Sequence, residues 1–156
     1  SPVAREAVDL VDLVENVVAA HSLPARAKLM HTELTLQARR CLAEPALLIS
    51  VMDNLYSNAV HYGAESGNIR IHSYRHGEQV RIDVANSGEP IPAAEKNMIF
   101  EPFYQGSHQR KGAVKGSGLG LSIARDCVRQ MQGELSLVDA PAGQVCFRIM
   151  LPSAPE

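Results

Sequence analysis

The sequence has no tryptophan, few other aromatic residues and only three cysteines. The cysteines, Cys41, Cys127 and Cys146, are odd in number and far apart, which excludes a disulfide framework and a C-x-x-C metal site. We expect them to be reduced thiols of a cytoplasmic domain. No two of the six histidines have the spacing of metal ligands on a helix. No apolar run is long enough to cross a membrane, and a net charge of −2 argues against nucleic acid or a membrane surface as the partner.

What is present suits one compact domain, because 46% of the 156 residues are hydrophobic. Apolar residues at helical spacing predict four helices, at 8–21, 45–62 and 93–99 and from the glycines near 120 to Gly133. Alternating apolar residues predict five strands, at 28–36, 68–74, 79–85, 134–138 and 145–151. We expect Pro24 to end the first helix and Gly133 to cap the last one.

Two asparagines lie four residues apart on the helix predicted at 45–62. Asn54 and Asn58 therefore share one face beside the apolar stripe, with His61 one turn further on. Asparagine is a mediocre helix former, so two in register cost stability unless another group uses their amides. One such asparagine is usually solvated or capping, whereas the pair makes a functional site a serious alternative.

A glycine-rich segment, 115–120, comes directly before an amphipathic run. Glycines let the backbone approach a ligand closely. A helix that begins there directs free N–H groups and the positive end of its dipole toward the ligand, an arrangement that binds phosphate. Taken alone, the same segment is better explained by a flexible loop before an ordinary helix.

Two other segments place polar or aromatic residues in loops. The strand at 79–85 runs into Asn86-Ser87-Gly88, at a strand end where ligand contacts are common. Phe100, Phe103 and Tyr104 form an aromatic cluster before a polar, basic loop at 106–115. We expect Phe100 and Phe103 to anchor that loop rather than to touch a ligand.

In this order, the four segments resemble the N, G1, F and G2 blocks of the catalytic, ATP-binding domain of bacterial sensor histidine kinases. That family belongs to a superfamily that also contains DNA gyrase and the Hsp90 chaperones. The resemblance covers nearly the whole chain, and we treat residues 1–156 as one domain. It implies an α/β fold, a two-layer sandwich in which three helices cover a mixed, mostly antiparallel sheet. ATP would lie between the asparagine-bearing helix and a lid at about 105–115.

The resemblance also implies roles for single residues. Asn58 stands at the Mg²⁺-binding position, where an amide oxygen suits a hard cation. Asn54 lies beside the triphosphate, where ATP-hydrolysing relatives have a glutamate base; an amide cannot act as a base. Asn54 and Asn58 are thus the implied catalytic pair, and Tyr62 and Asn86 would meet the adenine. The residues implied to contact Mg-ATP are Asn54, Asn58, His61, Tyr62, Asn86, Gly88, Arg110, Lys111, Lys115, Gly116, Gly118, Leu119 and Gly120.

The sequence departs from the family pattern at four positions. Asn86 stands where the family usually has an aspartate, and Pro90 replaces the second glycine of that block. His61 replaces a lysine, and Gln105 replaces an arginine that often follows the aromatic cluster. Asn86 can still accept a hydrogen bond from the adenine amino group, but without the charge of a carboxylate. We therefore expect adenine specificity with weakened affinity.

In this family the phosphate-accepting histidine lies on a separate helical hairpin, and no histidine here stands in such a motif. We expect the chain to bind ATP and Mg²⁺ but not to autophosphorylate alone. The implied partners are the phosphoacceptor and dimerisation domain of its own protein and, for the full-length protein, a response regulator. That protein would be a membrane-anchored homodimer, with this domain on the cytoplasmic side of the inner membrane. The isolated domain would be monomeric, and no nucleic acid is expected as a partner.

Other interpretations follow from the same residues. A degenerate, non-catalytic nucleotide-binding or interaction module would account for Asn86, Pro90 and His61. An anti-sigma-type serine kinase would share the four blocks but act on a small partner protein. A Rossmann dinucleotide domain is disfavoured, because its G-x-G-x-x-G directly follows a strand, whereas the G-x-G-x-G here follows a basic loop.

Overall fold

The computed structural model describes residues 3–104 and 120–155. Its helical elements are α1 (Leu10–Ala20), α2 (Ser22–Ala27), α3 (Pro45–Tyr62), the 3₁₀ turn η1 (Ala93–Glu95) and α4 (Gly120–Gln130). Its strands are β1 (Glu6–Asp9), β2 (His31–Leu36), β3 (Arg40–Ala43), β4 (Asn68–His76), β5 (Gln79–Ser87), β6 (Glu134–Val138) and β7 (Gln144–Pro152).

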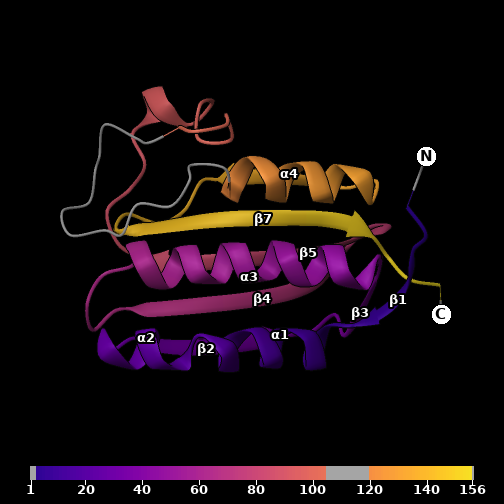
Figure 1. Cartoon of the computed structure of the whole chain (residues 1–156), viewed down its shortest axis with the longest axis horizontal. Coiled ribbons are helices and arrows are strands. Elements are labelled where there is room, and N and C mark those ends of the chain that lie inside the picture. The colour runs from indigo at the N-terminus through magenta and orange to yellow at the C-terminus, as the bar shows by residue number, and fades with distance from the viewer. Residues whose placement is uncertain (1–2, 105–119, 156) are drawn as a thin grey trace.

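Most of the strands form one mixed sheet, in the order β2-β4-β5-β7-β6. β2 runs parallel to β4, and the remaining neighbours are antiparallel. The helices α1, α3 and α4 lie side by side over one face of this sheet (Figure 1). The predicted two-layer α/β sandwich, with a mostly antiparallel sheet under three helices, is confirmed.

The core lies between the helices and the sheet, because side chains alternate between the two faces of each strand. Ile71 of β4, Ile82 of β5 and Ile149 of β7 are completely buried on the helix-covered face. They belong to the same apolar cluster as Leu48 and Leu55 of α3. Burying a side chain of this size stabilises the fold by about 1.5–3 kcal/mol. The apolar stripe of α3 therefore fixes this helix, and the polar residues beside the stripe, against the sheet.

The bounds of α3 are those that the sequence predicts. The Glu44 carboxylate accepts a hydrogen bond from a first-turn N–H at 2.7 Å, and Pro45 occupies a turn where its missing N–H costs nothing. After Tyr62 the chain leaves the helix at Gly63 with an extended backbone. A Cβ at Gly63 would collide with the side chain of Met30 and lie 2.5 Å from the carbonyl oxygen of Ala59. This close approach requires glycine.

The prediction for the N-terminal region is wrong in one respect. The first helix begins at Leu10, not at residue 8, because residues 6–9 form β1, which pairs antiparallel with β3. Asp9 caps the helix, accepting hydrogen bonds from two first-turn N–H groups at 2.8 and 3.3 Å. Neither four-residue strand was expected, because so short a segment shows too few alternations to be recognised. Val8 and Cys41, which pair across the two strands, are buried.

The first helix was expected to end at Pro24. It ends at Ala20 instead, and a second helix, α2, begins at Ser22. Pro24 lies in the first turn of α2, where proline is tolerated because the N–H groups there have no intrahelical partner. The segment Lys28–Met30 turns the chain, so β2 begins at His31 rather than at residue 28. The expected helix at 93–99 is reduced to the single turn η1.

The end of α4 also differs in detail. Gln132, not Gly133, has the left-handed conformation, with φ of 66°. Gly133 is needed for a different reason, since a Cβ there would collide with the carbonyl oxygen of Met150. The residue thus allows the chain to pass close to β7 as β6 begins.

Candidate nucleotide-binding site

One face of α3 carries the polar residues that the sequence singled out. Asn54, Asn58 and Tyr62 follow one another at intervals of four residues, so they form a stripe along the helix. Asn54 and Asn58 are partly buried. Among residues 3–104 and 120–155, neither of their side-chain amides takes part in a hydrogen bond. Amides held at the edge of a core without partners are suited to bind a polar ligand.

The N-terminus of α4 meets this stripe at Asn54. A Cβ placed on Gly120, the first residue of α4, would lie 2.5 Å from Nδ2 of Asn54. The backbone at the start of α4 therefore touches the side chain of Asn54 only because residue 120 is glycine. Two of the predicted segments, far apart in the sequence, come together here, and the first N–H groups of α4 lie beside the asparagine stripe.

The other end of the stripe meets the end of β5. Asn86 is 8% exposed, and its Nδ2 donates a hydrogen bond to the carbonyl oxygen of Ser87 at 3.1 Å, which leaves its own amide oxygen to accept one. The N–H of Ala64, just after α3, donates to the same Ser87 oxygen at 2.9 Å. A Cβ on Gly88 would lie 3.3 Å from the carbonyl oxygen of Tyr62. The predicted G1 segment is therefore joined to the last turn of α3.

His61 and Tyr62 lie in that last turn. Their rings meet edge to face, with centroids 4.6 Å apart and an interplanar angle of 81°. Both side chains are partly exposed. They lie at the same end of α3 as Asn86 and Gly88, which is where the resemblance placed the adenine.

The aromatic cluster is only partly as expected. Phe100 is buried, packs edge to face against Phe147 and lies under the guanidinium of Arg125, 4.0 Å from its ring centroid. Tyr104 donates a hydrogen bond to the buried carboxylate of Glu95. Phe103 is 68% exposed, so the expectation that it anchors the segment is wrong. Phe100 and Tyr104 hold this part of the chain instead.

Several predicted site residues lie outside the described part of the chain. Gln105 and the segment of the expected lid, about 105–115, lie outside the described residues. The same is true of the remaining predicted contacts, Arg110, Lys111, Lys115, Gly116, Gly118 and Leu119. Their roles stay predictions.

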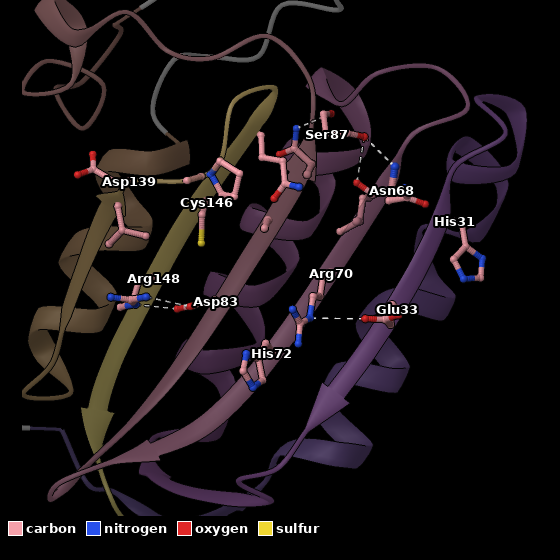
Figure 2. Close-up of a pocket in the computed structure, with 17 residues that line it drawn as sticks. His31, Glu33, Asn68, Arg70, His72, Asp83, Ser87, Asp139, Cys146 and Arg148 are labelled. Atoms are coloured by element: carbon pink, nitrogen blue, oxygen red, sulfur yellow. Dashed lines mark hydrogen bonds and ion pairs between the residues drawn. The ribbon is translucent and has the colours of Figure 1, made fainter.

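A different hollow lies on the face of the sheet that carries no helices. It has a volume of about 490 Å³ and is lined mainly by polar residues of β2, β4, β5 and β7 (Figure 2). Its charges pair with one another. The guanidinium of Arg148 donates to both oxygens of Asp83 at 2.9 and 3.1 Å, and Arg70 lies 3.5 Å from Glu33. The hydrogen bonds that Arg148 donates to Asp83 raise the pKa of its guanidinium above the ordinary value. The sequence reasoning did not predict this hollow.

Within the described residues, no group of three or more His, Cys, Asp or Glu side chains is placed to hold a metal ion. The side-chain amide oxygen of Asn58 is of the type that Mg²⁺ accepts as a ligand. In the same described part of the chain, no helix has the length and apolar character needed to cross a bilayer.

Fold and site together define a nucleotide-binding catalytic domain, in which an asparagine-bearing helix meets a glycine-led helix at one end and a polar strand end at the other. The chain belongs to the family of histidine kinase-, DNA gyrase B- and HSP90-like ATPases, which matches residues 43–155. Within that family, it is the ATPase catalytic domain of a sensor histidine kinase.

Two sensor histidine kinases are similar over almost the whole chain. GlrK of Escherichia coli K12 is 71% identical and QseE of Escherichia coli O157:H7 is 70% identical, each over 154 residues and 99% of this chain. The aligned region is 32% of each relative, so the chain spans about a third of their length.

Solved catalytic domains have the same fold. The catalytic domain of the histidine kinase ThkA superposes with a TM-score of 0.83 at 29% identity, covering 98% of this chain and all of that one. ThkA in complex with the response regulator TrrA superposes with a TM-score of 0.78 at 27% identity, covering 97% of this chain and 42% of that one.

Proposed function

We propose that this chain binds Mg-ATP and donates the γ-phosphate to a histidine on a separate dimerisation domain. The observation that carries the proposal is the junction at Asn54 and Gly120. There, an amide that makes no hydrogen bond within the described residues lies beside the first backbone N–H groups of α4. In the proposed step, the bond between the γ-phosphorus and its bridging oxygen breaks as a phosphorus–nitrogen bond forms. ADP is the leaving group, so the chemistry is mainly positioning and charge stabilisation.

Asn58 and Asn54 have different proposed roles. The amide oxygen of Asn58 would hold Mg²⁺, which neutralises charge on the phosphates when it is bound. Asn54 would orient the triphosphate through hydrogen bonds. Because an amide is no base at neutral pH, Asn54 would not activate water, and ATP would be kept for transfer to histidine.

The adenine would lie at the other end of the stripe. Asn86 would accept a hydrogen bond from the adenine amino group, and Tyr62 would pack near the ring. Gly88 leaves room there, since a side chain at this position would crowd Nδ2 of Asn86 at 3.2 Å. His61 would face the phosphate side more weakly than a lysine, because its charge depends on pH.

The residues outside the described ranges complete the proposal. Arg110, Lys111 and Lys115 would neutralise phosphate charge, and the segment 116–120 would bring backbone N–H groups to the phosphates. The whole protein would be a membrane-anchored homodimeric receptor with this domain in the cytoplasm. A response regulator would receive the phosphate, in keeping with the complex of ThkA with TrrA. The isolated chain would be monomeric.

The test is phosphotransfer in trans. The chain, incubated with γ-labelled ATP, Mg²⁺ and a separately produced phosphoacceptor and dimerisation domain of the same protein, should label that domain's histidine. The chain alone should not become labelled. Nucleotide binding without transfer would identify the degenerate, non-catalytic module instead, and labelling of a serine would identify a serine kinase.

A further inference from the structure

Lys28 lies just after α2, and its ammonium reaches the end of α3. Nζ donates hydrogen bonds to the carbonyl oxygens of Val60, His61 and Gly63, at 2.8, 2.9 and 2.7 Å. The last carbonyls of a helix have no intrahelical partner, and they form the negative end of the helix dipole. Lys28 therefore satisfies three acceptors at once, and its positive charge is favourable at the C-terminal end of α3.

The end of α3 needs this lysine because it lacks the usual closure. Helices often end with a residue in the left-handed conformation, whose following N–H groups turn back to the last carbonyls. Gly63 is instead extended, with φ of −66° and ψ of 159°. The carbonyls of the last turn are consequently left for a side chain to satisfy.

The backbone of Lys28 holds the next turn as well. Its carbonyl oxygen accepts a hydrogen bond from the N–H of Ser66 at 2.8 Å. The N–H of Ala64, which lies between these contacts, donates to Ser87 at 2.9 Å. Lys28, the end of α3 and the end of β5 therefore form one continuous hydrogen-bonded unit, at the end of the molecule where α2 lies (Figure 1).

Lys28 is partly buried, and burial lowers the pKa of its ammonium, an effect that the nearby carboxylate of Glu65 partly opposes. An ammonium in this position loses some of its hydration, which is unfavourable unless it is well hydrogen-bonded. A lysine that only kept the surface soluble would extend into water instead. The geometry is that of a structural clamp on one helix end.

We propose that Lys28 is a positioning residue for the adenine side of the nucleotide site, acting through the last turn of α3 and the Ser87–Gly88 backbone bonded to it. This inference rests on the proposed function, because it assumes that adenine lies between Tyr62 and Asn86. Lys28 itself touches no nucleotide in this proposal. It holds in place the residues that contact the adenine.

The test compares Lys28→Met with Arg26→Met, a control that removes one positive charge from an exposed position two residues away. Affinities for adenosine, for ADP and for Mg-ADP are measured by calorimetry well below the melting temperature of each variant. Lys28→Met should weaken the binding of adenosine and of ADP by the same factor, on the order of tenfold. The gain in affinity that Mg²⁺ gives ADP should not change, because Asn58 is untouched. Arg26→Met should bind all three ligands as the unchanged protein does.

Two further readouts separate positioning from mere stability. Lys28→Arg, which keeps the charge and several donors, should recover most of the lost affinity. In the nucleotide-free protein, the N–H of Ala64 should exchange its hydrogen faster in Lys28→Met but not in Arg26→Met. If Lys28→Met does not fold, Lys28→Gln takes its place with the same expectations, because its neutral amide removes the charge and has two N–H donors for the three acceptors.

The proposal is overturned if Lys28→Met melts at a lower temperature but binds adenosine and ADP unchanged. It is equally overturned if the loss appears only with ADP and Mg²⁺, or if the Ala64 amide stays protected. Failure of the proposed function would look different, because the unchanged protein would then bind none of the adenine ligands. In that case, faster exchange of the Ala64 N–H in Lys28→Met would still show that Lys28 holds the end of α3. The proposed role of Lys28 toward adenine would be refuted.

Discussion

The two faces of the central sheet carry polar residues in opposite ways. On the helix-free face, charged side chains are numerous and neutralise one another, as Asp83 and Arg148 do at 2.9 and 3.1 Å (Figure 2). On the helix-covered side, the candidate site contains few charges among the described residues. It presents the amides of Asn54 and Asn58, without partners there. The amide of Asn86 has one bond to the backbone, and this residue also lines the hollow.

This difference indicates which polar side chains are left for a ligand to bind. A paired surface charge already has its partner, so it offers little to an incoming group. A partly buried amide without a partner costs stability in the free protein and recovers it when a ligand supplies the missing hydrogen bond. The face with more charge and the hollow of about 490 Å³ is therefore not the one to which we assign nucleotide.

Asn58→Ala should have the largest effect. Removing the proposed Mg²⁺ ligand should lower the rate of phosphotransfer to the separate dimerisation domain by about a hundredfold or more, since metal charge stabilisation contributes several kcal/mol. Asn68→Ala, on the rim of the hollow of the helix-free face, is the matched control and should leave the rate unchanged. Equal effects of the two substitutions would remove the distinction between the faces.

Asn86→Ala should come next. Losing the acceptor for the adenine amino group leaves a buried donor unsatisfied, which costs about 1–3 kcal/mol, or roughly 5- to 150-fold in ADP affinity. Titration calorimetry measures this directly. Asn86→Asp should instead tighten binding, because a carboxylate accepts a charge-assisted hydrogen bond. Unaltered ADP affinity in Asn86→Ala would refute the role of this residue.

Asp83→Ala should affect stability but not binding. It leaves the partly buried guanidinium of Arg148 without its bidentate partner and removes the acceptor of the Tyr74 hydroxyl. The free energy of unfolding in urea should fall by about 1–3 kcal/mol. The dissociation constant for Mg-ADP should stay within a factor of about two. A loss of affinity as large as that of Asn86→Ala would indicate that nucleotide binds on the helix-free face, against our assignment.

Glu33→Gln should have the smallest effect. The side chains of Glu33 and Arg70 are 63% and 52% exposed and their atoms are 3.5 Å apart, so the pair is a solvent-screened contact. We expect a change of less than about 1 kcal/mol in urea denaturation and none in nucleotide affinity. A larger loss would mean that the hollow has a structural role beyond its individual ion pairs.

The sequence predicted the elements whose limits are set locally. α3 could be placed at 45–62 because Pro45, Gly63 and a regular apolar stripe mark it, and β6 could be placed at 134–138 by simple alternation. The strands β1 and β3 were missed because each has four residues and is defined by its pairing with the other. Short pairings between distant segments leave no local pattern.

The site divides in the same way. Asn54 and Asn58 were found from their helical spacing, and Asn86 was found from its place at the end of a predicted strand. The role of Asn86 toward adenine came from the resemblance to a family. The contact of Gly120 with Asn54 could not be predicted from either segment alone, because it depends on how α4 packs beside α3. Lys28 was not recognised at all, since its three acceptors lie more than thirty residues away in the sequence.

The most direct test of the account follows the side-chain amide signals of asparagines by NMR while Mg-ADP is added. Asn58 lies in the candidate site, and Asn68 lines the hollow of the helix-free face, so the molecule contains its own control (Figure 2). Asn86 lines the hollow as well, so its signal does not separate the two faces. We predict a large shift for the side-chain amide of Asn58 and none for that of Asn68. A shift at Asn68 with Asn58 unchanged would contradict the assignment of nucleotide to the helix-covered side.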